Sequence, residues 1–216
     1  MKIHQIFGLF NDGKRLQDIP KFVGQTSKTF DFCVKEGIDY KMWDLADCVK
    51  LIDKYPQYRE LWDSFRHPIQ RADFVRYLIL YDEGGIYLDC DVCPIADIRE
   101  LFTRKEFFVT WNCDKTKNAR FKELPYNAVM GSQCKNPLFI EIIQEVMRSV
   151  EEKNQIAIYE RWIGRYVFQT TGHYMLRRVL KKHPHIPILN ILKVIKRNKT
   201  IVGDNPMFED LNANTW

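Results

Sequence analysis

Apolar and polar positions along the chain alternate between short extended stretches and longer helical ones. Short apolar runs predict strands over 2–7, 86–89, 106–112 and 126–132, with a further strand that ends at Trp43. Apolar residues three and four positions apart predict helices between these strands. Alternating strand and helix patterns favour an α/β sheet protein. We expect a single domain over 1–216 with one sizeable core.

The pattern around position 80 carries the most specific signal. Apolar residues recur at helical spacing from Ile69 to Asp82. Gly84 and Gly85 are expected to end that helix, because glycine accepts the left-handed conformation found beyond a helix C-terminus. A short apolar strand follows, and it leads directly into Asp89 and Asp91.

Two carboxylates one residue apart at the end of a buried strand need a physical reason. In an extended strand, residues i and i+2 point to the same face, so Asp89 and Asp91 are expected to project together. Such carboxylates repel each other unless a positive charge lies between them. Mg²⁺ or Mn²⁺ fits this role, since Mg²⁺ commonly binds one or two carboxylates together with substrate phosphates. Ligands of open α/β sheets also bind at the carboxyl ends of strands.

A structural alternative exists for each of these charges. The D-x-D triplet also suits a solvated turn. Asp73 and Arg76 lie three residues apart on one face of the predicted helix, where they could form an ordinary ion pair.

Composition adds the general class of protein. The chain has 216 residues, of which 45% are hydrophobic and 28% charged, and a formal net charge of +5. These values are ordinary for a globular protein, and the mild positive charge does not identify a partner. We expect no nucleic-acid partner. No run of about 18 apolar residues predicts a membrane-spanning helix, and the start is a poor signal peptide. A cytoplasmic protein is therefore expected.

Cysteine chemistry is expected to be structural. The six cysteines are Cys33, Cys48, Cys90, Cys93, Cys113 and Cys134. Three disulfides would require a secreted protein. The single C-x-x-C at 90–93 has no second pair at zinc-finger spacing. We therefore expect reduced, mostly buried thiols.

The stretch "RADFVRYLILYDEGGIYLDCDV" resembles the signature of glycosyltransferases with a D-x-D sugar-binding region, which make up glycosyltransferase family 32 and its neighbours. The group includes yeast α-1,6-mannosyltransferases, α-1,4-galactosyltransferases and capsule or lipopolysaccharide transferases. "IHQIFG" resembles its I-H-Q-I-W strand, "KMWD" its L-W-D segment, "NAVMGS" its central strand and "TTGHYML" a T-G-P segment. The resemblance implies a GT-A fold, which is a Rossmann-like domain with a central mixed sheet flanked by helices.

The resemblance also implies residue roles in donor binding. Asp73 and Arg76 match residues that hold the sugar hydroxyls and the donor, and Asp73 joins the catalytic set. Tyr87 matches a position that lines the ribose pocket, and Asn127 opens the central strand and joins the donor site. Phe7 matches an aromatic residue that packs on the nucleotide base, although a plain core position is an equal alternative.

For the acidic doublet, the resemblance implies both metal binding and catalysis. Asp89 would face the ribose and sugar and contact Mn²⁺ or Mg²⁺ partly through water. Asp91 would be the direct metal ligand.

Two positions depart from the family pattern. Relatives often carry a His or Glu shortly before a terminal Ser-Trp, whereas this chain ends "FEDLNANTW". Asp210, Asn212 or Asn214 would then supply the remaining metal ligand, and Trp216 would cover the diphosphate. His173 replaces the usual proline of the T-G-P segment.

The resemblance implies transfer of a hexose with retention of configuration. A UDP-sugar is the favoured donor and GDP-mannose the second, and the acceptor would be a glycan or a lipid-linked saccharide. Retaining glycosidases use a carboxylate nucleophile, but no residue in this sequence identifies itself as one. A front-side displacement is therefore expected, in which the leaving phosphate accepts the acceptor's proton.

A basic segment suggests where such an acceptor could be met. Residues 161–203 contain no acidic residue but ten lysines and arginines. They form either a solvated basic face or a peripheral contact with anionic lipid at the inner face of the membrane.

Two other functions fit parts of the sequence. "YLDCDV" also matches the nucleophile motif of haloacid-dehalogenase-like phosphatases, with Asp89 as the phosphorylated nucleophile and Asp91 as the general acid. That nucleophile normally lies near the N-terminus, which disfavours this interpretation. A catalytically inactive sugar-nucleotide-binding relative is the third hypothesis, because the C-terminal metal region is altered.

Overall fold

The computed structural model describes residues 1–10, 13–103, 107–111, 124–154, 163–196 and 199–211. Its helices are α1 (Pro20–Glu36), α2 (Leu45–Asp53), α3 (Arg59–Ser64), α4 (Pro68–Glu83), α5 (Arg99–Thr103), α6 (Leu138–Asn154), α7 (Ile163–Thr170) and α8 (His173–Leu180), with 3₁₀ turns at Leu16–Asp18 and Pro56–Tyr58. Its strands are β1 (Lys2–Ile6), β2 (Asp39–Trp43), β3 (Gly85–Leu88), β4 (Val92–Pro94), β5 (Phe108–Trp111), β6 (Pro125–Ser132), β7 (Ile188–Leu189), β8 (Leu192–Lys196), β9 (Lys199–Val202) and β10 (Phe208–Asp210).

The central sheet is mixed, as expected. Its six strands lie in the order β2-β1-β3-β6-β5-β7. Strand β1 pairs in parallel with β2 and β3, whereas β6 is antiparallel to both β3 and β5. The predicted alternation of strands and helices is confirmed.

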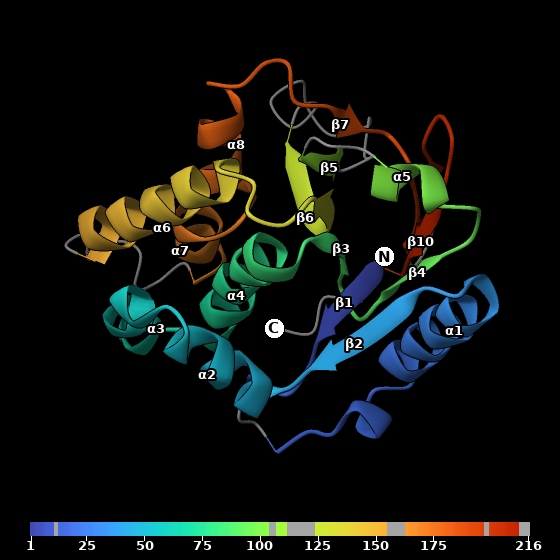
Figure 1. The fold of residues 1–216 in the computed structure, drawn as a ribbon, viewed down its shortest axis with the longest axis horizontal. Coiled ribbons are helices and arrows are strands. Elements are labelled where there is room, and N and C mark those ends of the chain that lie inside the picture. The colour runs from blue at the N-terminus through green and yellow to red at the C-terminus, as the bar shows by residue number, and fades with distance from the viewer. Residues whose placement is uncertain (11–12, 104–106, 112–123, 155–162, 197–198, 212–216) are drawn as a thin grey trace.

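Helices cover one face of this sheet, and α1, α5 and a second sheet cover the other (Figure 1). Side chains that alternate along each strand therefore enter two separate cores. Tyr87 packs into the core formed with α2, α3, α4, α6 and α8, while its neighbours Ile86 and Leu88 pack into the core under α1 and α5. Because β3 is buried on both faces, its short sequence is apolar throughout.

The second sheet was not predicted from the sequence. It has the order β4-β10-β8-β9, and its antiparallel pair of β4 and β10 places Asp210 opposite Val92. The C-terminal part of the chain thereby returns to the segment that immediately follows the acidic doublet. The strands are short and come from distant parts of the sequence, which explains why local patterns did not reveal them.

The glycine pair between α4 and β3 is required by both conformation and space. Gly84 and Gly85 have φ angles of 68° and 90°. A Cβ atom at Gly85 would lie 2.4 Å from the carbonyl oxygen of Lys2, and one at Gly84 would lie 2.5 Å from the amide nitrogen of Cys134. The prediction that the helix ends at this pair is confirmed, but the ψ angle of −159° at Gly84 differs from the expected left-handed helical conformation.

The described part of the basic segment 161–203 is shared among several elements. It is divided between α7 and α8 on one side of the molecule and the strands β7, β8 and β9. Arg178 is bound within the helical layer to Glu145, at 2.7 Å, and Lys193 pairs with Glu209 at 2.8 Å.

Most of the described cysteines are buried, as expected. Among the described cysteines, Cys33, Cys48, Cys90 and Cys93 are buried and free, and Cys134 is exposed and free. Cys113 lies outside the described residues. No helix within the described ranges is long and apolar enough to span a bilayer.

His4 joins β1 to the start of β3 and to β2. Its Nδ1 accepts a hydrogen bond from Trp43 Nε1 at 3.0 Å, so its Nε2 carries the proton and donates to the Gly84 carbonyl at 2.9 Å. Burial lowers the pKa of this imidazole from 6.5 to about 4. The unfolded chain therefore binds more protons than the folded one between these two values, and acidification through this window destabilises the fold.

We predict that His4→Gln makes stability less sensitive to acid. Between pH 7 and pH 5, the decrease in the free energy of unfolding should be smaller in the variant by about 2 kcal/mol, because the titrating group has been removed. Urea denaturation at both pH values measures this difference. His185→Gln, at an exposed histidine, is the control and should retain the wild-type pH dependence. Equal acid sensitivity of wild type and His4→Gln would contradict the assignment.

Candidate functional site

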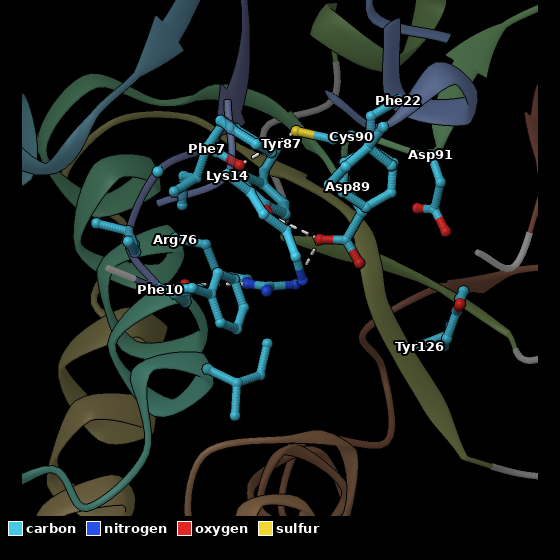
Figure 2. A pocket seen from close by; sticks show the side chains of 16 residues that line it. Phe7, Phe10, Lys14, Phe22, Arg76, Tyr87, Asp89, Cys90, Asp91 and Tyr126 are labelled. Carbon is cyan, nitrogen blue, oxygen red and sulfur yellow. Dashed lines mark hydrogen bonds and ion pairs between the residues drawn. The ribbon is translucent and has the colours of Figure 1, made fainter. Parts of the chain in front are cut away.

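A cavity of about 130 Å³ lies beside the carboxyl ends of β1 and β3. Its wall combines aromatic and polar side chains (Figure 2). The aromatic residues are Phe7, Phe10 and Phe22, and the polar ones include Lys14, Arg76, Tyr87, Asp89, Asp91 and Tyr126. Such a combination suits a ligand that carries both a flat ring system and charge.

The acidic doublet lies in a turn and not in an extended strand. Strand β3 ends at Leu88, and the Val92 amide donates to the Asp89 carbonyl at 3.0 Å. The turn is needed because Val92 begins β4, which belongs to the second sheet. Asp89 and Asp91 nevertheless both line the cavity, so their predicted common orientation arises from the turn.

Asp89 is oriented by two donors that come from different elements. Its Oδ1 accepts from Arg76 Nη1 on α4 at 3.0 Å and from the Tyr87 hydroxyl on β3 at 2.8 Å. Its other oxygen points away from both donors (Figure 2). The side chain is 32% exposed, so this carboxylate is held on one side and accessible on the other.

Arg76 is buried because α4 is buried on nearly every side. A buried charge has to be paired, and Arg76 pairs with Asp89 and, through Nη2, with Asp73 at 3.2 Å. Its Nη1 also donates to the Asn127 carbonyl, and its guanidinium lies 4.6 Å from the centre of the Tyr87 ring. Burial by itself would lower the pKa of Arg76. The nearby Asp89, Tyr87 and Asp73 raise this pKa by more than burial lowers it, so the guanidinium remains charged.

Asp73 and Asn127 lie behind this arginine and not on the cavity wall. Asp73 is 5% exposed and accepts from Asn127 Nδ2 at 3.0 Å and from the Thr171 hydroxyl at 2.9 Å. Burial raises the pKa of Asp73 in spite of Arg76. The ion pair with Arg76 that the helical spacing allowed is therefore present. A direct contact of Asp73 or Asn127 with a donor stays a prediction.

The aromatic wall includes one predicted residue and two that sequence reasoning missed. Phe7 is partly exposed on the cavity and packs edge-on against Phe22, with ring centroids 6.2 Å apart. Phe7 is therefore not a plain core residue, and its packing on a nucleotide base stays a prediction. Phe10 and Phe22 also line the cavity. Neither lies in one of the short motifs that resemble those of the family, so only the tertiary structure places them at the same cavity as Phe7.

Tyr126, at the start of β6, is a further site residue that the sequence did not reveal. Burial raises its pKa well above the ordinary value, and the carboxylates of Asp210, Asp91 and Asp89 add to this effect. Its hydroxyl hydrogen-bonds to Asp210, which is fully buried. Tyr126 therefore connects the C-terminal strand to the acidic turn. The signal available was its place directly before Asn127 in "PYNAVMGS".

The predicted C-terminal ligands are only partly placed. Asp210 lies near the acidic turn, and the Leu211 amide donates to the Asp91 carbonyl at 3.0 Å. Asn212, Asn214 and Trp216 lie outside the described residues. Their metal-binding and donor-covering roles stay predictions.

The oxygen atoms at the acidic turn fit a hard divalent cation. Asp89 and Asp91 supply two carboxylates on one cavity wall, and Mg²⁺ commonly takes one or two carboxylates plus substrate phosphates. Within the described part of the chain, no group of three or more His, Cys, Asp or Glu side chains is arranged to hold a metal. The described residues therefore do not form a complete metal-binding cage. They fit a metal site in which a substrate supplies the remaining ligands.

Comparison with known proteins identifies the kind of domain. Residues 11–108 match the family model of a glycosyltransferase sugar-binding region containing a DXD motif. A mannosyl phosphorylinositol ceramide synthase of Saccharomyces cerevisiae is 28% identical over 162 residues, which cover 59% of this chain and 42% of that protein. An uncharacterized glycosyltransferase of Acanthamoeba polyphaga mimivirus is 31% identical over 149 residues, which cover 67% of this chain and 54% of that protein. The matches thus span about half of these relatives' length.

Among solved structures, the PaToxG glycosyltransferase is similar, with a TM-score of 0.52 and 14% sequence identity. The match covers 84% of this chain and 68% of that one. At this identity the likeness concerns the fold, and the expected GT-A fold is confirmed.

We predict that Arg76→Met destabilises the protein strongly. Removing the guanidinium leaves Asp73 and Asp89 without their shared cation, and loss of one partner of a buried pair costs about 3–5 kcal/mol in the free energy of unfolding. Urea denaturation measures this loss. The control is Arg59→Met, which removes an exposed pair with Asp63 and should cost at most about 1 kcal/mol. Similar losses in both variants would argue against Arg76 as the central cation.

Proposed function

The chain belongs to the glycosyltransferases whose sugar-binding region contains a DXD motif, and on that premise we propose that it is a metal-dependent hexosyltransferase. It would transfer a hexose from a nucleotide-sugar donor to a glycan or a lipid-linked saccharide. One observation carries the proposal: both aspartates of the motif line the same cavity as three phenylalanines. A nucleotide-sugar has the matching chemistry, with a planar base at one end and a diphosphate at the other.

Asp89 and Asp91 would hold Mn²⁺ or Mg²⁺. When bound there, the metal would act as a Lewis acid that stabilises negative charge on the leaving diphosphate. Arg76 and Tyr87 keep Asp89 in one orientation through Oδ1, which directs its other oxygen toward the site. Because the protein's own side chains fix this orientation, little reorganisation of the carboxylate is needed during the reaction.

The aromatic wall would bind the nucleotide base. Phe7, Phe10 and Phe22 offer ring surfaces, and Lys14 adds a positive charge to the same cavity. A base that stacks on such rings is held with little hydrogen bonding, so this wall favours nucleotides as a class over free sugars. The acidic turn would then bind the diphosphate.

We propose a mannosyl donor, which moves GDP-mannose ahead of the UDP-sugars favoured by the sequence analysis. The reason is the name of the similar yeast protein, a mannosyl phosphorylinositol ceramide synthase. The same name supports a lipid-linked acceptor. Membrane contact through residues 161–203 stays a prediction, and it would depend on exposed cations such as Arg165, Lys181 and Lys182, because Arg178 and Lys193 are engaged in ion pairs. The cytoplasmic location also stays a prediction.

We predict metal-dependent donor binding and hydrolysis. Isothermal titration of GDP-mannose, UDP-glucose and UDP-galactose, with and without Mn²⁺, should show binding of one donor class only with the metal. Slow hydrolysis of that donor should decrease on the order of a hundredfold in Asp91→Asn, because a group that stabilises developing charge is lost. Asp97→Asn, which alters an exposed carboxylate paired with Arg99, is the control and should hydrolyse at the wild-type rate.

Other outcomes of this experiment would identify the rival functions. Binding of a sugar nucleotide without any turnover would indicate an inactive relative. Release of phosphate from monoesters would indicate a phosphatase with Asp89 as its nucleophile.

We also predict that the product retains the anomeric configuration of the donor. Among the described residues that line the cavity, Asp89 and Asp91 are the carboxylates, and both are assigned to the metal. A front-side displacement therefore fits better than a covalent intermediate. Proton NMR of the first product formed from an α-linked donor would show an α-anomer, and a β-anomer would exclude the mechanism.

A further inference from the structure

A buried glutamine lies directly behind the acidic turn. Gln5, on β1, is fully buried, and its Nε2 donates to the carbonyl of Asp89 at 3.0 Å and to that of Val92 at 3.3 Å. These two carbonyls stand at the two ends of the turn that carries the aspartates. Gln5 does not line the cavity, so it acts on the backbone and not on a ligand.

A second side chain determines which way the Gln5 amide points. The Tyr40 hydroxyl on β2 donates to Gln5 Oε1 at 2.8 Å. Burial raises the pKa of Tyr40 further above neutrality, so this hydroxyl keeps its proton and remains a donor. With its oxygen occupied, the amide presents both N–H groups to the two carbonyls of the turn.

Additional contacts hold the same turn against β1 and α1. The Cys90 thiol, between the two aspartates, donates to the Ile6 carbonyl at 3.1 Å. The Thr29 hydroxyl on α1 donates to the Val92 carbonyl at 3.3 Å. Gln5 is the one that joins both ends, because a single amide group bonds to Asp89 and Val92.

The acidic turn needs such support for a physical reason. Two carboxylates within three residues repel each other, and the repulsion favours backbone conformations that separate them. Arg76 and Tyr87 bond to the side chain of Asp89, whereas Gln5 bonds to its backbone carbonyl. Groups behind metal ligands that fix their orientation commonly change metal affinity 10–100-fold when removed.

We propose that Gln5 is a positioning residue that holds Asp89 and Asp91 in the arrangement that binds the divalent cation. This inference rests on the proposed function. It explains why a glutamine occupies a fully buried place in β1, where an aliphatic side chain would satisfy packing alone.

The test compares two glutamines of equal burial. Gln5→Met removes the amide behind the turn with little change in volume. Gln70→Met removes another fully buried amide, which donates to the Thr170 hydroxyl at 3.0 Å and does not line the cavity. Mn²⁺ binding is measured by the loss of the free-ion EPR signal, with Mn²⁺ alone and with UDP or GDP added. Urea denaturation of each variant gives the accompanying change in stability.

The expected result separates affinity from stability. Both variants should unfold at lower urea concentrations than the wild type. Only Gln5→Met should bind Mn²⁺ more weakly, by about tenfold or more, while Gln70→Met should stay within about twofold. Tyr40→Phe, which removes only the bond to Gln5 Oε1, should show an intermediate loss of about threefold. It keeps the test valid if Gln5→Met does not fold.

Two results would overturn the proposal alone. The first is that Gln5→Met binds Mn²⁺ within about twofold of the wild-type affinity; if Gln5→Met does not fold, the same result for Tyr40→Phe counts. The second is that Gln70→Met loses as much Mn²⁺ affinity as Gln5→Met. If the wild-type protein itself binds no Mn²⁺ with any of these probes, the proposed function fails and this inference fails with it.

Discussion

The buried guanidinium of Arg76 is the interaction on which the site depends. A charge inside a helix that is buried on nearly every side has to be neutralised by other buried groups. Asp73 satisfies it from one side and Asp89 from the other, and the backbone carbonyl of Asn127 completes the set. The arginine thus links α4, the acidic turn and β6. Because breaking one pair would leave an uncompensated charge, these three elements are held in one relative position.

Different parts of the protein hold the two aspartates of the motif. Asp89 is held by Arg76 and Tyr87 through a single oxygen. Asp91 lies in a turn that hydrogen bonds connect to β1 and to Leu211, the residue after β10. Catalysis by charge stabilisation needs groups that are already oriented before charge develops. Here the orientation comes from Arg76 and Tyr87, which also line the cavity, and from Gln5, which bonds to the backbone of the turn from behind.

Strand β1 has only five residues, but two of its side chains hold the ends of β3 in place. Its alternate side chains reach opposite faces of the sheet. His4 binds the carbonyl of Gly84 before β3 begins, and Gln5 binds the carbonyl of Asp89 after β3 ends. The two consecutive polar residues therefore hold both ends of β3, which explains why a buried strand contains them at all. Each is fully hydrogen-bonded, so its burial carries little penalty.

The sequence by itself determined the α/β class, the helix that ends at the glycine pair, the strand after it and the acidic doublet, because these features depend on local periodicity and backbone conformation. Only the tertiary structure decided that the doublet lies in a turn, that Phe10 and Phe22 join Phe7, and that Tyr126 meets Asp210. These relations join residues far apart in the chain through short strands and single side-chain contacts. Such contacts leave no periodic trace in the sequence, since they depend on how the two sheets and α4 pack together.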